Sequence, residues 1–102
     1  MQHVRTALYT FKPGTTDEVI RRAQEGMLPT FRRQPGFVAY GVVKTGENSA
    51  ISLSFWQSRE QADAAVQVAA SWVKDNIAEM VESVQNYVGD LAFLSSEGSL
   101  GS

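Results

Sequence analysis

The chain has no cysteine and only one histidine in 102 residues. Without cysteine there is no disulfide, no thiolate nucleophile and no sulfur ligand for a metal. One imidazole, on His3 near the start of the chain, is too small a ligand set for a transition metal. We therefore expect no metal site and no other bound cofactor.

The sequence also lacks the features of several partner classes. A net charge of -2, from 9 basic and 11 acidic residues, offers no basic surface for nucleic acid or for an anionic membrane. No apolar run approaches the ~20 residues that span a bilayer, and the first residues lack the basic and apolar regions of a signal peptide. The glycines follow no phosphate-loop spacing. We expect no nucleic-acid or membrane partner, and a cytoplasmic location.

The rest of the chain is organised around residues 50–84. Apolar residues alternate with serines over 51–55, as in a strand. Residues 58–61 then form a capping-box pattern, which predicts a helix start. Apolar residues continue at spacings of three and four, so we predict one helix over 58–84. Because this is long for a globular helix, we expect a bend near Ser71 or Asn76.

Four further elements and their breaks complete the prediction. They are a strand over 2–11, a helix from the capping-box pattern at Thr15 to about Arg33, a strand over 37–44 and a last strand over 86–94. Pro29 should make the first helix kink or restart. Residues 45–48 should form a hairpin turn between the second strand and the third.

The predicted order is strand, helix, strand, strand, helix, strand. Two strand–helix–strand units in tandem indicate a ferredoxin-like α+β fold. The sheet is then antiparallel, with strands ordered 4-1-3-2 and both helices on one face. We predict a single domain over residues 1–95 and a flexible Gly/Ser-rich tail over 96–102.

This fold leaves one face of the sheet without helices. The second and fourth predicted strands are apolar on both faces, so apolar residues such as Val38, Tyr40, Val42 or their counterparts should stay uncovered. Monomers rarely expose a contiguous apolar patch of that size. We expect a homodimer that packs through the sheet face. The alternative is a monomer whose C-terminal segment folds over that face.

Several short motifs together resemble one family. Tyr9 and Phe11 end the first strand before a Lys-Pro-Gly break. Residues 34–37 read Gln-Pro-Gly-Phe, residues 55–58 read Phe-Trp-Gln-Ser, and Trp72 lies in the second helix. Over residues 3–94 this pattern resembles the antibiotic biosynthesis monooxygenase family of small dimeric α+β barrels.

The resemblance implies a ligand cavity between the sheet and the helices of each protomer. Family members include oxygenases that need no cofactor and oxidise polycyclic phenols or quinols. Others degrade haem, using an Asn on the first strand with a Trp and a His on the second helix. Here Ala7 and Glu82 stand at the matching Asn and His positions. The resemblance therefore disfavours haem degradation.

Three polar residues are candidates for catalysis. Arg5 shares a strand face with Tyr9 and would hold a substrate enolate or phenolate, or a superoxide-like species. Asn76, one turn after Trp72, carries an amide that would face the same cavity. Asp90 interrupts an apolar strand and would act as a base if its pKa were raised by desolvation. The structural alternative pairs Asp90 with Arg5 or His3.

Aromatic residues are the candidates for substrate binding. They are Tyr9, Phe11, Trp56 and Trp72, which would form flat apolar walls; the alternative for each is packing in the core. We predict a monooxygenase that acts on a small flat aromatic or quinol-type molecule without metal or flavin. The competing prediction is a non-catalytic ligand-binding or stress-response dimer. Polar side chains converging in the cavity would favour the enzyme.

Overall fold

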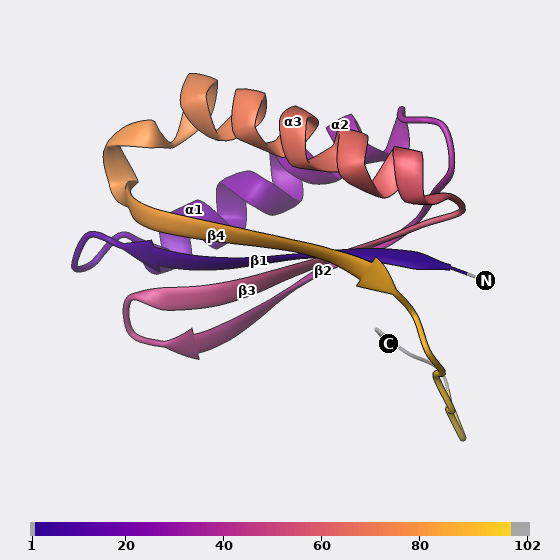
Figure 1. Cartoon of the computed structure of the whole chain (residues 1–102). Helices are drawn as coiled ribbons and strands as arrows, with labels where there is room; N and C mark the ends of the chain where they lie inside the picture. Colours follow the sequence, from indigo (N-terminus) through magenta and orange to yellow (C-terminus); the bar gives the residue numbers. More distant parts are fainter. Residues whose placement is uncertain (1, 99–102) are drawn as a thin grey trace.

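A computed structural model describes residues 2–98. Its strands are β1 His3–Phe11, β2 Phe37–Gly46, β3 Ser49–Trp56 and β4 Val81–Asp90, and its helical segments are α1 Thr16–Arg22, η1 Ala23–Met27, α2 Leu28–Arg32, α3 Arg59–Asn76 and η2 Ala78–Met80. The strands pair antiparallel in the order β2-β3-β1-β4. All the helices lie on one face of this sheet (Figure 1). The predicted ferredoxin-like α+β fold and strand order are confirmed.

The first helical region is interrupted as Pro29 predicted. A π-helical turn, η1, separates α1 from α2, and the N–H of Leu28 bonds to the carbonyl of Ala23, five residues back. Pro29 lies in the first turn of α2, where its missing N–H is tolerated. The hydroxyl of Thr30 donates to the carbonyl of Gly26 over 2.8 Å. A new helical segment, α2, therefore begins next to Pro29. Just before it, the small residue Gly26 lies against Trp72 of α3.

The two predicted capping boxes differ in outcome. At α3 the backbone N–H of Gln61 donates to Ser58 Oγ over 3.1 Å, so the predicted helix start is correct. The Gln61 side chain does not reach back, however, and lies against Gly36, whose φ of +79° suits glycine. At α1 the prediction is wrong, because the Thr15 hydroxyl donates to the Lys12 carbonyl and caps no helical N–H.

The largest error concerns where the second helix ends. It stops at Asn76, and β4 begins at Val81 rather than at residue 86. The short η2 turn buries Ile77 and Met80. These two residues are three apart, the same spacing that the apolar face of a helix shows. The valines that follow pair with β1 as a strand. Residues 91–98, of which 91–94 were predicted as strand, carry no helix or strand.

The two faces of the sheet differ in residue size and burial. Facing the helices are Arg5, Ala7, Tyr9 and Phe11 of β1, with Ala50, Ser52, Ser54 and Trp56 of β3, all buried. In register with β3, Tyr40 and Val42 also face the helices, so they are not part of the uncovered face. That face instead carries Leu8, Val43 and Tyr87, which are 39%, 50% and 56% exposed.

The interior between sheet and helices contains two apolar clusters. The first, which we call the packed cluster, consists of Ala23, Met27, Phe31, Trp56, Ala62, Ala65 and Ala69. The second, the cavity cluster, consists of Ala7, Tyr9, Phe11, Val19, Ala50, Ile77 and Met80. Trp72 contacts both clusters.

Of the tail predicted over 96–102, residues 99–102 lie outside the described residues. Within residues 2–98 no helix combines the length and apolarity required to cross a bilayer.

Candidate functional site

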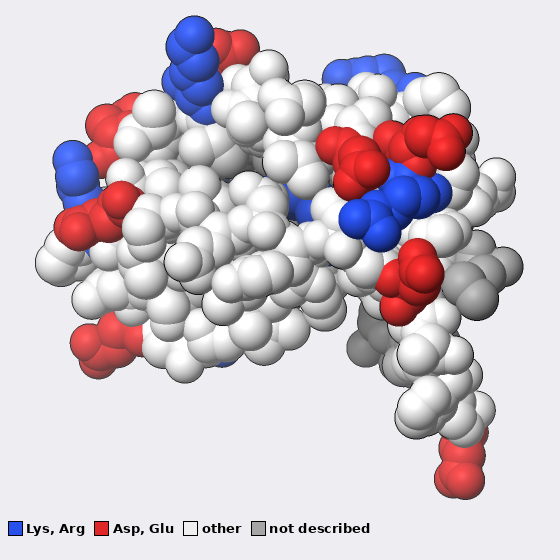
Figure 2. Space-filling model, viewed as in Figure 1, with Lys and Arg blue, Asp and Glu red and all other residues white. Residues whose placement is uncertain are grey.

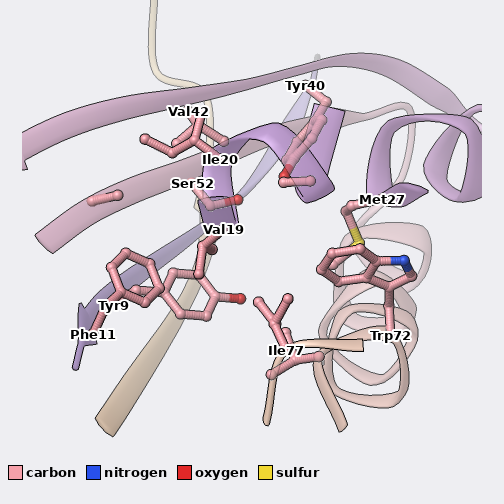
Figure 3. Close-up of a pocket in the computed structure, with 13 residues that line it drawn as sticks. Tyr9, Phe11, Val19, Ile20, Met27, Tyr40, Val42, Ser52, Trp72 and Ile77 are labelled. Atoms are coloured by element: carbon pink, nitrogen blue, oxygen red, sulfur yellow. The ribbon is translucent and has the colours of Figure 1, made fainter. Parts of the chain in front are cut away.

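A small, partly open cavity lies between the sheet and helices α1 and α3. Its volume is about 30 Å³, enough for one or two water molecules. Thirteen residues line it: Tyr9, Phe11, Val19, Ile20, Ala23, Met27, Tyr40, Val42, Ala50, Ser52, Trp72, Val73 and Ile77. Figure 3 shows Tyr9 and Phe11 on one side of this space and Trp72 beside Met27 on the other. The predicted cavity between sheet and helices is therefore present.

Three hydroxyl groups interrupt the apolar wall. They belong to Tyr9, Tyr40 and Ser52, from three different strands. Burial raises the pKa of Tyr40 to about 12, because the phenolate would lose its hydration, and the Ser52 side chain opposes part of this rise. Tyr40 is therefore a neutral phenol at physiological pH, able to donate or accept a hydrogen bond.

A buried arginine stands behind Tyr9. Arg5 is only 1% exposed, and no carboxylate among residues 2–98 forms an ion pair with it. Its Nε donates to Asn86 Oδ1 over 3.0 Å and its Nη2 to Tyr9 Oη over 3.2 Å. The guanidinium carbon lies 6.0 Å from the centre of the Phe31 ring. Nη1 is buried with no hydrogen-bond partner in the described structure.

This arrangement fixes the role of the Tyr9 hydroxyl. Arginine has no acceptor, so the phenol oxygen of Tyr9 accepts from Arg5 and its own proton remains available to another group. A buried positive charge with neutral partners also favours a negative charge nearby, because few water molecules screen it. Tyr9 and Arg5 together can hold an oxyanion at the cavity wall.

Trp72 closes the cavity without being fixed in place by a hydrogen bond. No bond from its indole N–H is found within the described part of the chain, and the side chain is half-buried. A Cβ added to Gly26 would lie 2.9 Å from both Nε1 and Cζ2 of the indole. The ring therefore sits directly on the glycine of the π-helical turn.

The structure places four of the predicted site residues at or behind the cavity. Tyr9, Phe11 and Trp72 line it, and Arg5 contacts Tyr9. Trp56 does not line this cavity. It is 1% exposed, its indole N–H donates to Ser54 Oγ over 2.9 Å, and it packs edge-on against Phe31 at 5.4 Å.

The other two predicted catalytic residues lie outside the cavity. Asn76 is exposed, and its amide donates to the carbonyl of Trp72 over 2.8 Å. Asp90 is exposed at the end of β4, where its carboxylate lies 2.8 Å from His3 Nδ1. Pairing with His3 was the structural alternative for Asp90. Neither residue meets Arg5 or Tyr9 in this structure.

Ala7 and Glu82, which stand at the Asn and His positions of the haem-degrading branch, lie on two strands. Ala7 is fully buried in β1, while Glu82 lies exposed on β4 rather than on α3. His3 does not line the cavity. In the described part of the chain no group of three or more His, Cys, Asp or Glu side chains is placed to hold a metal ion.

Four residues of the site are not among the predicted site residues. Ser52 and Asn86 look like ordinary strand residues, Tyr40 was expected on the uncovered sheet face, and Gly26 lies within a helical pattern. A glycine three residues before Pro29 was the one available signal of a distorted helical turn. The partners of Arg5 are not visible from the sequence, since Asn86 is 81 residues away.

Comparison with known proteins identifies the family. The family model for antibiotic biosynthesis monooxygenase matches residues 1–71, more than half of the chain. The chain belongs to the antibiotic biosynthesis monooxygenase family. A search of curated proteins found no match.

Solved structures share the fold at low sequence identity. A protein of unknown function from Nitrosomonas europaea has a TM-score of 0.75 and 16% identity, with 96% of each chain covered. SnoaB from Streptomyces nogalater, a cofactor-independent oxygenase, has a TM-score of 0.66 and 13% identity, covering 99% of this chain and 98% of its own. A protein from Shewanella oneidensis has a TM-score of 0.68 and 22% identity, covering 86% and 88%. These structures support the fold.

Proposed function

We propose that the protein is a cofactor-independent monooxygenase that acts on a small flat aromatic or quinol-type substrate. The observation that carries the proposal is the buried Arg5, which has no carboxylate partner among residues 2–98 and donates a hydrogen bond to the Tyr9 hydroxyl at the cavity wall. Family membership and the fold shared with a cofactor-independent oxygenase support it at a coarser level.

In this proposal the substrate supplies both the acidity and the electrons. An anthrone-like CH₂ group, conjugated with a carbonyl through the aromatic rings, loses a proton to solvent, and the resulting enolate oxygen takes the hydrogen bond from Tyr9. The positive charge of Arg5 favours that ionised form. The enolate then passes electrons to O₂, and overall CH₂ and O₂ become C=O and H₂O. The protein contributes charge stabilisation and exclusion of water.

The competing function is binding of a ligand without turnover. A cavity lined only by carbon would have favoured it, but the hydroxyls of Tyr9, Tyr40 and Ser52 converge on this one. The enzyme is the better supported of the two functions for this reason. The two functions remain separable, because only the enzyme consumes oxygen.

We also propose that the protein works as a homodimer joined through the uncovered sheet face. On that face the exposed side chains of Leu8, Val43 and Tyr87 surround the half-buried Ile51 and Phe55. Figure 2 views the molecule with β4 in front and shows most of the charged side chains in that view over the helices and toward the two ends. A second copy would remove this apolar surface from water.

The test is oxygen consumption with anthrone as substrate. Wild-type protein should consume one O₂ per anthrone oxidised. Arg5→Met should lower kcat by about 10²–10³-fold, because it removes the buried positive charge that favours the enolate and the donor that orients the Tyr9 hydroxyl. Tyr9→Phe should lower it by about 10–100-fold, corresponding to one hydrogen bond to a charged group. Arg32→Met, which removes an exposed arginine, is the matched control and should leave the rate unchanged.

Two results would contradict the proposal, the first its enzymatic activity and the second the role of Arg5 and Tyr9. If anthrone and simple quinols bind but no oxygen disappears, the protein is a binder. If oxygen is consumed equally by wild type and Arg5→Met, the Arg5–Tyr9 pair has no part in the chemistry.

A further inference from the structure

The cavity as it stands is too small for the substrate class just proposed. Small-molecule sites usually enclose about 300–1,000 Å³, while this cavity holds about 30 Å³. A flat aromatic molecule can enter only if part of the wall moves. The question is which lining residue moves.

A large groove lies on the other side of Trp72. It has a volume of about 440 Å³ and is lined by Thr30 of α2 and by six residues of α3, namely Gln67, Val68, Ser71, Trp72, Asp75 and Asn76. Trp72 is the residue common to this groove and to the cavity. If its indole swings aside, the two spaces join and reach the size of an ordinary ligand site.

A second hollow, of about 230 Å³, meets the cavity at β2. It shares Ile20, Tyr40 and Val42 with the cavity lining. Of these, Tyr40 packs edge-on against Phe31, with ring centres 5.0 Å apart, and Tyr40 and Val42 belong to a paired strand. This wall is therefore better anchored than Trp72, whose indole N–H has no partner in the described structure.

Gly26 determines where the indole rests when the cavity is closed. The π-helical turn brings its backbone so near that any Cβ would meet the ring at 2.9 Å. That is closer than side-chain atoms pack, so alanine here must push the indole away. Single π-helical turns of this kind are rare and often lie at functional sites.

We propose that Trp72 is the movable wall through which the cavity fills from the groove along α3, and that Gly26 sets its closed position. A flat aromatic ligand would take the place of the indole in the opened space. The inference rests on the proposed function for its ligand class. It assigns to Gly26 a role in specificity through Trp72, without contact with the ligand.

The experiment has two parts. The first measures the solvent exposure of Trp72 without ligand, and the second measures the association rate of an aromatic anion. Labelling with 5-fluorotryptophan gives one ¹⁹F resonance for each of the two tryptophans. Trp56, which is fully buried, serves as the internal reference. A soluble nitroxide should broaden the Trp72 resonance at least twofold more in Gly26→Ala than in wild type. Ala70→Ser, at an exposed position two residues before Trp72, is the control and should match wild type.

The binding rate is measured by stopped flow with 2-naphthoate as the probe. Gly26→Ala and Trp72→Ala should each raise its association rate at least fivefold, whereas Ala70→Ser should not. Trp72→Ala serves as the second variant if Gly26→Ala fails to fold.

Three outcomes would overturn the inference. One is equal broadening of the Trp72 resonance in Gly26→Ala and wild type. Another is an association rate of 2-naphthoate that is unchanged in both Gly26→Ala and Trp72→Ala, which would place the entrance at β2. The third is no binding of 2-naphthoate by any variant at millimolar concentration. In that last case oxygen consumption with anthrone still decides the proposed function separately.

Discussion

The two tryptophans of the chain occupy similar places between sheet and helices, yet their surroundings differ. Trp56 is fully enclosed, bonded through its N–H to Ser54 and packed edge-on against Phe31 and Phe37. Trp72 is half-buried, has no hydrogen-bond partner for its N–H among residues 2–98, and borders a cavity. The packed cluster therefore encloses its tryptophan, while the cavity cluster leaves a small void beside Trp72.

The largest expected effect tests this difference in stability. Trp56→Ala should lower the free energy of unfolding by about 3–5 kcal/mol, the usual cost of removing a fully packed aromatic side chain. Trp72→Ala should cost about 1–2 kcal/mol, within the ordinary range for a residue beside a void and partly in water. Urea unfolding at matched protein concentration measures both. Equal losses would show that the cavity cluster is as tightly packed as the other.

The second effect concerns Tyr40, which lies between the two clusters. Burial raises its pKa from 10.0 to about 12. Between these values the unfolded chain has released the proton and the folded chain has kept it, so stability falls as the pH rises. The full loss is about 2–3 kcal/mol. Tyr40→Phe should remove this slope between pH 10 and 12, whereas Tyr87→Phe, at an exposed position, should keep it.

The smallest effect compares the helix starts beside the two clusters. Ser58 caps α3 next to Trp56, and Ser58→Ala should cost about 1 kcal/mol. Thr15 precedes α1 beside the cavity cluster and caps no N–H, so Thr15→Ala should change stability by less than about 0.5 kcal/mol. Thermal unfolding of the two variants makes the comparison. A larger loss for Thr15→Ala would contradict the described hydrogen bonds.

Local patterns predicted most of the fold. Alternation identified β1 and β3, Ser58 marked the start of α3, and Pro29 marked the restart of the first helix. The end of α3 was missed because Ile77 and Met80 keep a helical spacing while lying in a short turn. Only pairing with β1, a contact between distant residues, decides that Val81 begins a strand.

The candidate site was less accessible to sequence reasoning. Tyr9, Phe11 and Trp72 were correctly predicted to line the cavity. Aromatic side chains on the inner face of a strand or helix point into the interior. Asn76 and Asp90 lie outside the cavity. Asn76 was chosen because it follows Trp72 by one helical turn, and Asp90 because it interrupts an apolar strand. Neither position determines where the side chain points. The Arg5–Asn86 contact depends on strand register, which one sequence does not display.

The central claim is that the cavity beside Trp72 takes an aromatic anion against Arg5 and Tyr9. Equilibrium titration of 2-naphthoate and the uncharged, similarly shaped 2-naphthamide tests it most directly. Wild type should bind naphthoate at least tenfold more tightly than naphthamide, because a hydrogen bond to a charged group is worth about 1.5–3 kcal/mol. Arg5→Met should lose that preference. Tighter binding of the amide by wild type, or a preference for the anion that survives in Arg5→Met, would contradict the account.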